Sequence, residues 1–413
     1  MEPSLRARCA SWDQIVASIY RFYGKETPEL TPWAQYDLMM FFYLGGDVAH
    51  HHTEKEWYKI LAKKITLQHR GSVLFLRYPG WEDRDCQDVA CFDLDGTLIK
   101  ISGKGIPSTT TVWDWFTPVT LEILRKFVHD GYRLIFFSNR KRMADKPLQK
   151  TLTRMYRELQ MPFTFYGAHE DDQYRKPHTG MWRLCLEDWG KPQRAFYCGD
   201  AAGRPRDFSA SDRYFASNCS IPFNTPEELF QHSHQTLPSD YFDVSEFLAP
   251  PQQSSVYRPR GHELIMLVGY PGLGKTHYAH RMKKHDSDLV VVSRDEYHSN
   301  QVRIFRAVNE ALPNHTVVVD GTHPSESSRR PYRELAEELG VPILFIWFDF
   351  PIKVAEHVDA MRVELGAKPL PMVAFYIYRK NFEEFRKNDR VIHLTKLPWP
   401  HPPPQFFYHY VIK

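Results

Sequence analysis

Two carboxylates stand two residues apart where an apolar run ends in the first quarter of the chain. Residues 89–92 are Val-Ala-Cys-Phe, and Asp93, Leu94 and Asp95 follow directly, before Gly96. In an extended backbone, residues i and i+2 point to the same side, so both carboxylates would face one crevice at a strand end. Two like charges there are costly unless they serve a cation or a phosphate reaction. An ordinary strand followed by an Asx turn is the alternative.

Three more polar residues follow apolar strands or precede a helix farther along the chain: Ser138, Lys176 and Asp200. Ser138 can donate its hydroxyl to a phosphate, and Lys176 can offset negative charge on phosphoryl oxygens and on a nucleophile. Asp200 can complete an oxygen-rich Mg²⁺ site with Asp93 and Asp95. Taken singly, Ser138 also fits a strand-ending turn and Lys176 an exposed lysine. Together with the D-x-D-G-T-L pattern that begins at Asp93, the set resembles the haloacid-dehalogenase phosphatase superfamily.

The order of these residues predicts a covalent mechanism for phosphate-ester hydrolysis. Because Asp is a known nucleophile in phosphoryl chemistry, we expect Asp93 to attack phosphorus and form an aspartyl-phosphate. Asp95 would protonate the leaving oxygen and then activate the water that breaks this intermediate. A bound Mg²⁺ would reduce the repulsion between Asp93 and a dianionic phosphate.

A phosphate-binding loop is the second motif. Residues 269–276 read Gly-Tyr-Pro-Gly-Leu-Gly-Lys-Thr, which satisfies G-x-x-x-x-G-K-[ST] directly after an apolar run. The glycines let the backbone wrap phosphates, and the helix that follows points its amide groups at them. Lys275 should reach the β- and γ-phosphates of ATP, while Thr276 holds Mg²⁺. The predicted nucleotide-binding residues are Gly269, Gly272, Gly274, Lys275 and Thr276.

Two carboxylates follow the next strands of this second unit. Asp295 comes after Ser293 and Arg294, where it could take a proton from an incoming hydroxyl. Asp is also favoured as a helix N-cap, which is the alternative for Asp295. Asp320 ends the run Val317 to Val319 and is a Walker-B-like carboxylate.

Alternating strands and helices must position both motifs. Strands are predicted over 89–94, 132–138, 163–167 and 195–199, then over 263–268, 289–293, 316–320, 343–348 and 391–394, with helices over 118–129, 147–159 and 181–189. Short apolar strands separated by helices indicate parallel sheets covered on both faces. A segment rich in Pro, Gln and Ser over residues 249–259 separates the two units.

The predicted fold class is therefore α/β, with two doubly wound parallel-sheet domains. We place a haloacid-dehalogenase-like phosphatase domain at residues 86–248 and a P-loop kinase domain at residues 249–413. Apolar residues at helical spacing, among them Trp12, Ile15 and Ile19, predict a small and mainly helical region over residues 1–85.

Composition limits the function classes. The 413 residues are 42% hydrophobic and 25% charged, with a net charge of +3, so nucleic-acid binding would have to come from local grooves and not from a polycationic surface. The six cysteines show no C-x-x-C pairing or zinc spacing, which indicates a reducing compartment. No apolar run is long enough to suggest a membrane span.

Further sequence blocks narrow the family. Residues 199–204 read Gly-Asp-Ala-Ala-Gly-Arg, residues 207–213 read Asp-Phe-Ser-Ala-Ser-Asp-Arg, residues 225–228 read Thr-Pro-Glu-Glu, and Lys176-Pro177 precedes Thr-Gly-Met-Trp at 179–182. With these blocks the chain resembles, over roughly residues 88–395, the polynucleotide kinase 3′-phosphatase family of eukaryotic DNA-end repair. The resemblance implies a 3′-phosphate as the phosphatase substrate and a 5′-hydroxyl as the kinase acceptor.

Further residue roles follow from the resemblance alone. Asp207 and Asp212 would lie near the metal site, where they support it or fix its loops. Asp295 would be the base for the 5′-hydroxyl. Arg362 would be a lid arginine that balances charge on the transferring phosphoryl group, although a lone arginine on a helix also fits an exposed surface.

The chain departs from the family pattern at a few positions. Arg140 stands where relatives usually carry Gln, and Gly321 and His323 stand where they carry Asn. Arg329 and Tyr332, in contrast, fall where relatives have Arg and Tyr. These departures leave open the contacts that the neighbouring loops make with substrate.

We therefore expect an enzyme that uses Mg²⁺ and ATP to turn DNA breaks into ligatable ends. RNA-end healing, a binding scaffold with decayed sites, and a small-molecule phosphatase fused to an unrelated kinase are the alternatives. Residues 1–85 could contact DNA, the phosphatase domain or a repair protein. We expect a monomer and a nuclear location, with mitochondria and cytoplasm left open.

Overall fold

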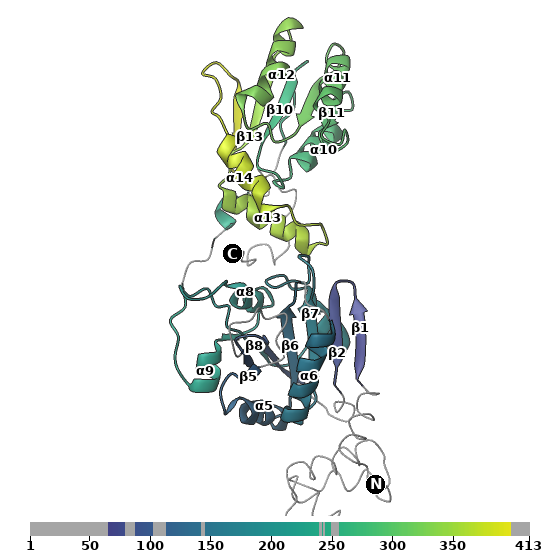
Figure 1. Ribbon diagram of the computed structural model, residues 1–413. Coiled ribbons are helices and arrows are strands. Elements are labelled where there is room, and N and C mark those ends of the chain that lie inside the picture. The colour runs from purple at the N-terminus through teal and green to yellow at the C-terminus, as the bar shows by residue number, and fades with distance from the viewer. Residues whose placement is uncertain are drawn as a thin grey trace, which may run out of the picture.

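The computed structural model describes residues 65–78, 87–101, 113–141, 145–238, 242, 244–248 and 256–397. Most of the predicted helical region over residues 1–85 lies outside these ranges. The described residues form two α/β domains, with helix α13 of the second domain placed next to the first domain (Figure 1). This arrangement confirms the predicted fold class for both units.

The first domain is built on a seven-stranded sheet with the order β1-β2-β7-β6-β3-β8-β9. Its strands are β1 (Thr66–Arg70), β2 (Val73–Arg77), β3 (Asp88–Phe92), β6 (Tyr132–Asn139), β7 (Thr164–Ala168), β8 (Ala195–Cys198) and β9 (Phe223–Asn224). Its helices are α5 (Thr120–His129), α6 (Asp145–Leu159), α7 (Gly180–Trp189), α8 (Ser211–Asn218) and α9 (Pro226–Gln231). The short strands β4 (Ile99–Ile101) and β5 (Trp113–Trp115) form a separate antiparallel pair.

Alternate side chains of each strand supply the two cores of this domain. In β3, Ala90 and Phe92 pack on one face of the sheet with apolar residues of α5 and α6. Val89 and Cys91 pack on the other face with apolar residues of α7 and α8. Because both faces are covered, the strands read as continuous apolar runs in the sequence, which is why they could be predicted.

The second domain carries a five-stranded parallel sheet with the order β11-β12-β10-β13-β14. Its strands are β10 (Leu264–Gly269), β11 (Val290–Ser293), β12 (Val317–Asp320), β13 (Ile343–Phe348) and β14 (Val391–Leu394). Its helices are α10 (Lys275–His285), α11 (Gln301–Ala311), α12 (Glu326–Glu338), α13 (Ile352–Glu364) and α14 (Met372–Asn381), and a single 3₁₀ turn, η1 (Ser245–Phe247), packs beside them. Residues of α10, α13 and α14 cover one face of the sheet, and residues of α11 and α12 cover the other.

The helical prediction for residues 1–85 is wrong where the structure describes this region. Residues of β1 and β2 form an antiparallel hairpin around Gly71, and β2 pairs antiparallel with β7. The first sheet is therefore mixed and not wholly parallel. The apolar run from Val73 to Leu76 alternates between the two cores, which is a strand pattern too short to be separated from a helix by periodicity alone.

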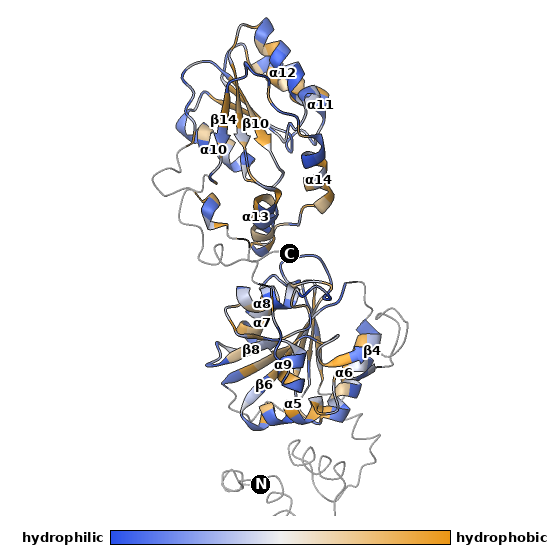
Figure 2. Cartoon of the chain, turned by 90° about the vertical axis from the view of Figure 1, so that its left-hand side faces the viewer, coloured by the Kyte–Doolittle hydropathy of each residue, from blue (hydrophilic) through white to orange (hydrophobic). Residues whose placement is uncertain are grey.

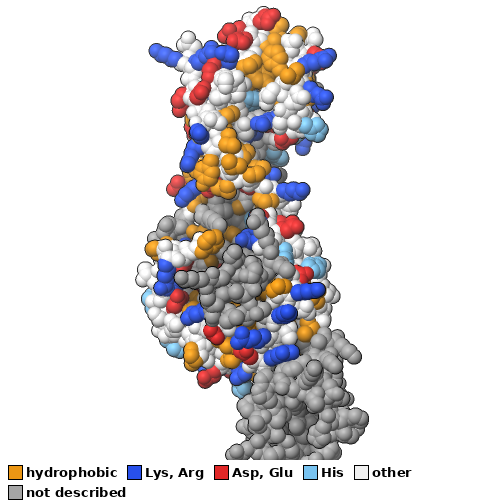
Figure 3. Space-filling view, viewed as in Figure 1, with side chains coloured by type: hydrophobic (Ala, Val, Ile, Leu, Met, Phe, Trp, Pro, Cys, Tyr) orange, Lys and Arg blue, Asp and Glu red, His pale blue; other side chains and the backbone are white. Residues whose placement is uncertain are grey.

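The surfaces agree with the composition. Figure 2 shows hydrophobic strands inside each domain and hydrophilic residues toward the outside of the helices. On the face seen in Figure 3, positive and negative side chains are mixed, in keeping with 53 Lys and Arg against 50 Asp and Glu residues in the sequence. Among the described helices, none is long and apolar enough to cross a membrane.

The aromatic core of the first sheet provides a test of domain independence. Phe136 is fully buried, and its ring lies 4.6 Å from that of Phe163. Truncation of a buried Phe to Ala costs about 3–5 kcal/mol, so Phe136→Ala should lower the unfolding free energy of the first domain by that amount. Phe345→Ala, at a fully buried position in the second sheet, is the matched control.

Hydrogen exchange in urea followed by mass spectrometry would report each domain separately. Phe136→Ala should speed exchange in the first domain, and Phe345→Ala should speed it in the second. Equal loss of protection in both domains from either variant would mean that the two sheets unfold as one unit.

Candidate active sites

The carboxyl ends of neighbouring strands bring the first set of predicted residues together. Asp93 follows β3, and its amide donates to the carbonyl of Cys198 at the end of β8, 2.8 Å away. Ser138 lies at the end of β6, the neighbour of β3 on the other side, and is buried. Asp200 follows β8 after one residue. Parallel pairing therefore places these three residues at one edge of the sheet.

Lys176 enters this edge from the loop before α7 and is almost completely buried. Its Nζ donates to Asp93 Oδ1 at 2.5 Å, to Asp212 Oδ1 at 2.7 Å and to the Tyr197 hydroxyl at 2.8 Å. Burial acts against the ammonium charge, but Asp212 and Asp93 outweigh it and raise the pKa of Lys176. The side chain is thus a cation held at the strand ends against Asp93, and its predicted role toward phosphoryl oxygens stays a prediction.

Asn139 holds the backbone of this lysine. Its side-chain oxygen accepts from the Lys176 amide at 2.9 Å, and its side-chain amide donates to the Lys176 carbonyl at 3.1 Å. Asn139 and Tyr197 were not predicted as site residues. Tyr197 lies within the predicted strand 195–199 and Asn139 directly follows the predicted strand 132–138, and only contacts across the sheet separate them from ordinary residues at a strand end.

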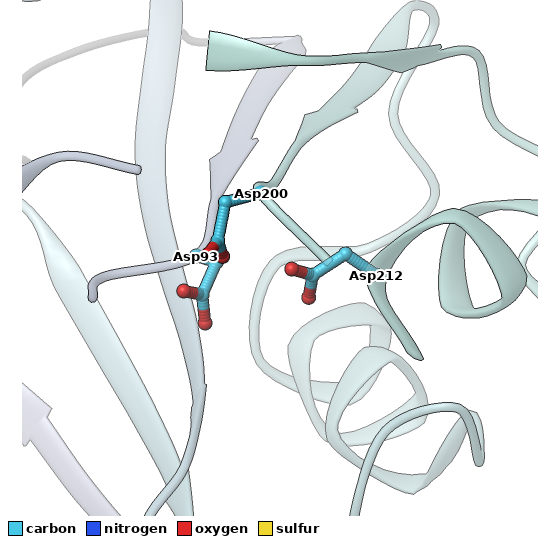
Figure 4. A group of neighbouring side chains, drawn as sticks. All are labelled: Asp93, Asp200 and Asp212. Atoms are coloured by element: carbon cyan, nitrogen blue, oxygen red, sulfur yellow. The ribbon is translucent and has the colours of Figure 1, made fainter. Parts of the chain in front are cut away.

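Three carboxylates meet beside Lys176. Oxygens of Asp93, Asp200 and Asp212 lie within 4.8 Å of one another (Figure 4). Burial, with the neighbouring carboxylates, raises the pKa of Asp93 to about 7 against the opposing charge of Lys176. Burial, together with Asp93 and Asp212, raises the pKa of Asp200 to about 8. A cluster that resists losing its protons is one that a bound cation would stabilise.

This group fits Mg²⁺, which prefers carboxylate oxygens. Asp93 and Asp200 were predicted as ligands and lie in the cluster, whereas Asp212 was assigned only a supporting role and contributes an oxygen itself. Asp212 opens α8, which the sequence patterns did not predict as a helix. Its fixed place beside Lys176 and the amide of Ala201 could not be seen without the fold.

Asp95, in contrast, turns to a different partner. Its Oδ2 forms an ion pair with Arg140 Nη1, 2.7 Å away, and the Arg140 side chain is nearly buried. The side chain of Asp95 is not part of the carboxylate group found among the described residues, so its prediction as a metal ligand is not supported. The cation that Asp95 contacts is thus Arg140, one of the positions at which the chain departs from the family pattern.

Glycines make room for the carboxylates. A Cβ on Gly96 would lie 2.4 Å from Asp200 Oδ2, and a Cβ on Gly199 would lie 2.5 Å from Asp212 Cβ. Any side chain at either position would push the carboxylates apart. Asp207 fixes the same loop from behind, because it accepts from the amide of Arg204 at 3.0 Å and pairs with its guanidinium at 2.7 Å.

The second predicted motif forms a phosphate-binding loop around a cavity of about 720 Å³. Gly272, Gly274, Lys275 and Thr276 line this cavity, and Gly269 ends β10 beside it. Lys275 donates to the carbonyl of Gly269 at 3.0 Å. Burial lowers the pKa of Lys275 to about 8, against the opposing charges of Asp320 and Asp295. A nucleotide phosphate would therefore be a better partner for this ammonium than the carbonyls that it now contacts.

Asp320 organises the metal side of this loop. Its Oδ2 accepts from the hydroxyl of Thr276 at 2.7 Å and from the hydroxyl of Ser293 at 3.0 Å. The Walker-B-like carboxylate and the loop threonine are thus in direct contact, and the metal role of Thr276 stays a prediction. Arg362 also lines the cavity, but its Nη1 is bound to Asp359 Oδ1 at 2.5 Å.

A groove adjoins the nucleotide cavity at Arg294 and Thr322. Exposed Arg294 lines both the nucleotide cavity and a second cavity of about 550 Å³, and Asp295 lines the first. Phe305 and Tyr332 line the second cavity with apolar surface. Asp295 therefore lies on the wall of the nucleotide cavity, next in sequence to Arg294, which both cavities share. Helix α11 begins only after the N-cap Asn300, so the N-cap alternative for Asp295 does not apply.

Gly321 and His323 form a matched pair in this groove. A Cβ on Gly321 would lie 2.5 Å from His323 Nε2, so the histidine ring occupies the space that a side chain at 321 would need. The ring meets Tyr332 edge-on, with centroids 5.8 Å apart. Burial and the charges of Lys275, Arg294 and Arg329 lower the pKa of His323 to about 3. The groove therefore presents a neutral imidazole.

The fold and the two sites define a class of enzyme in which one chain joins a carboxylate phosphoryl-transfer site to a P-loop nucleotide site. The family model described as polynucleotide kinase 3 phosphatase matches residues 88–230. A bifunctional polynucleotide phosphatase/kinase of Schizosaccharomyces pombe is 32% identical over 71% of this chain and 75% of its own length. The chain belongs to the family of bifunctional polynucleotide phosphatase/kinases.

Other relatives match the whole pair of domains or the first domain alone. A protein of Acanthamoeba polyphaga mimivirus, named as a bifunctional polynucleotide phosphatase/kinase, is 29% identical over 71% of this chain and 80% of its own length. The polynucleotide 3′-phosphatase ZDP of Arabidopsis thaliana is 31% identical over 35% of this chain and 24% of its own length. The family predicted from the sequence blocks is confirmed.

The carboxylate cluster predicts a pH-dependent affinity for Mg²⁺. Asp93 and Asp200, with pKa values of about 7 and about 8, must lose their protons before a cation binds. Mg²⁺ affinity measured by calorimetry should therefore rise as pH increases from about 6 to about 9. Asp200→Asn should flatten this dependence. An affinity that does not change with pH in the unsubstituted chain would contradict the assignment.

The same shifts predict the stability of the metal-free protein. The usual Asp pKa is 3.8, and the folded-state pKa values of Asp93 and Asp200 are about 7 and about 8. Between pH 3.8 and these values, the folded state therefore binds more protons than the unfolded state. Without Mg²⁺, the melting temperature of the first domain should fall as pH rises from about 4 to about 8. Added Mg²⁺ should reverse the loss at the upper end of this range.

Arg140 should matter for the phosphatase reaction alone. Arg140→Ala removes the partner that orients Asp95, and since a general acid and base contributes roughly 10²- to 10⁴-fold, we expect phosphatase kcat to fall by at least about tenfold. Arg140→Gln keeps a hydrogen-bond donor and should lose less. Kinase activity is the internal control, and an unchanged phosphatase kcat in Arg140→Ala would show that the ion pair has no catalytic role.

Proposed function

We propose that this chain heals broken DNA ends with two reactions. The first domain, called the phosphatase domain from here on, removes a 3′-phosphate. The second, called the kinase domain, transfers the γ-phosphate of ATP to a 5′-hydroxyl. The observation that carries the proposal is the pair of complete sites on one family chain: Lys176 bound to Asp93 in one sheet, and the phosphate-binding loop with Asp320 in the other.

In the phosphatase domain, the free oxygen of Asp93 forms a bond to phosphorus while the bond from phosphorus to the sugar 3′-oxygen breaks. Asp95 gives a proton to that oxygen and then takes one from the water that hydrolyses the aspartyl-phosphate. Lys176 holds the second oxygen of Asp93 and keeps the nucleophile aimed. Mg²⁺ held by Asp93, Asp200 and Asp212 would supply charge compensation for the dianionic phosphate.

In the kinase domain, the 5′-oxygen of the acceptor forms a bond to the γ-phosphorus of ATP, and ADP leaves. Asp295 takes the proton of the acceptor hydroxyl at the mouth of the groove. When ATP binds, Lys275 leaves the loop carbonyls and contacts phosphate oxygens instead. Arg362 leaves Asp359 and contacts the phosphoryl group that is being transferred. Mg²⁺ held by Thr276 and Asp320 would offset charge on the nucleotide phosphates.

DNA breaks are the proposed substrate, and RNA ends are the alternative. Removal of a 3′-phosphate and addition of a 5′-phosphate leave the 3′-hydroxyl and 5′-phosphate that ligation needs. We propose a monomer, because residues of one chain complete both sites. We propose a nuclear location, where such breaks arise, and a role for residues 1–85 in contact with DNA or a repair protein.

One substrate tests both reactions. A nicked duplex with a 3′-phosphate and a 5′-hydroxyl, offered with ATP and Mg²⁺, should lose the first and gain the second. Asp93→Asn should remove at least about 99% of the phosphatase rate, since nucleophile and acid–base groups act as a unit, and leave the kinase rate intact. Lys275→Ala should do the reverse. Loss of both activities from either single change would contradict the two-site account.

Matched ribose and deoxyribose ends separate the alternatives. Oligonucleotides that differ only in the 2′-hydroxyl at each end should react faster as DNA. Faster reaction of the RNA ends would favour RNA healing. Failure of the unsubstituted chain at both ends, with ATP turnover also absent, would favour a scaffold with decayed sites.

A further inference from the structure

The kinase domain inserts one buried carboxylate into the phosphatase domain. Glu364, the last residue of α13, has a side chain that is only 4% exposed. It accepts hydrogen bonds from the amide of Thr179 at 3.0 Å, from the Thr179 hydroxyl, and from Arg183 Nη1 at 2.6 Å. His178 Nδ1 lies 3.3 Å from Glu364 Oε2. All three partners belong to the phosphatase domain.

The segment that Glu364 binds is the continuation of the catalytic lysine loop. Thr179 is the N-cap of α7, its own side chain makes no capping hydrogen bond, and its hydroxyl donates to Glu364. The carboxylate also lies at the N-terminal end of α7, where the helix dipole favours negative charge. Glu364 thus holds the N-cap residue of α7 from another domain.

Only two residues separate this anchor from Lys176. Between them, the carbonyl of Pro177 accepts from Asn218 at 2.9 Å. The lysine must keep its Nζ within 2.5 Å of Asp93 Oδ1 and 2.7 Å of Asp212 Oδ1. Misplacement of a catalytic group by about 1 Å can cost roughly 100-fold in rate. The anchor at Glu364 is therefore close enough to affect the reaction.

The same helix end borders the nucleotide cavity. Arg362 and Leu370 line that cavity, and Asp359 binds both of them, through Arg362 Nη1 at 2.5 Å and the Leu370 amide at 3.0 Å. Burial raises the pKa of Asp359. The Leu370 amide, Arg362 and, across the domain boundary, His178 act in the opposite direction and lower it, but they do not outweigh the burial. A nucleotide phosphate that draws Arg362 away would leave Asp359 with fewer partners beside the residues that hold Glu364.

We infer that Glu364 is a positioning residue of the phosphatase site that is supplied by the kinase domain, and that it transmits nucleotide occupancy of the kinase cavity to the Lys176 loop. The inference rests on the proposed function of both sites. It gives the fusion of the two domains a physical consequence, because the phosphatase would not be independent of ATP even on a substrate that never reaches the kinase domain.

The test measures phosphatase kcat and KM on thymidine 3′-monophosphate, which is too small to span both sites. Glu364→Gln should lower kcat about tenfold and leave KM within about twofold, because the substrate contacts remain while the lysine loop loses its anchor. Arg183→Gln should lower kcat in the same way, and the double variant should be no worse than Glu364→Gln, since both remove one interaction. Glu356→Gln, on the same helix two turns earlier, is the matched control and should change neither constant.

A non-hydrolysable ATP analogue with Mg²⁺ provides a readout that a purely structural role would not move. The analogue should change phosphatase kcat at least twofold in the unsubstituted chain and in Glu356→Gln, but not in Glu364→Gln. Lys275→Ala should also abolish the response, because it weakens nucleotide binding. Thermal unfolding should show both domains folded in every variant.

Three results would overturn the inference: an unchanged kcat in Glu364→Gln, an analogue response that survives in Glu364→Gln, or no analogue response in the unsubstituted chain. Failure of the proposed function is a different result. In that case the unsubstituted chain would release no phosphate from the nucleotide or from a 3′-phosphorylated DNA end.

Discussion

The contact between one buried ammonium and two carboxylates governs the phosphatase domain. Lys176 Nζ lies within hydrogen-bond distance of Asp93 and Asp212, and all three side chains are nearly excluded from solvent. Removing one partner from such a group leaves an uncompensated buried charge, which costs about 3–5 kcal/mol. With Asp200 added, the group holds three carboxylates against one ammonium. Without a further cation the carboxylates keep protons, as the raised pKa values of Asp93 and Asp200 indicate, so a divalent cation would fit this group.

The two sheets position the charged groups of their sites in different ways. Each must bring charged groups to the carboxyl ends of buried parallel strands without exposing the core. The phosphatase domain does so with side chains, since Asp93 and Asp200 follow adjacent strands and Gly96 and Gly199 leave space for them. The kinase domain does so largely with backbone, since its glycine loop and the first turn of α10 line the nucleotide cavity. The first site therefore depends on side-chain packing, and the second depends on loop conformation.

Strand positions could be predicted because buried parallel strands are continuous apolar runs. Residues 132–138 and 391–394, for example, fall within or on β6 and β14. The fold could not be predicted where pairing partners lie far apart. The hairpin β1–β2 joins the sheet through β7, almost a hundred residues later in the chain, and no local pattern specifies that contact. The orientation of Asp95 was missed for the same reason, because its partner Arg140 comes from the next strand of the sheet.

Departures from a family pattern are informative when they occur in pairs. Gly321 alone would appear to loosen the loop after β12, and His323 alone would appear to crowd it. The structure shows that the ring of His323 fills the place where a side chain at 321 would project. The lost volume is thus restored two residues later, and the ring packs edge-on against Tyr332. The groove thus presents the neutral imidazole of His323 against Tyr332, and position 321 adds no side chain beside it.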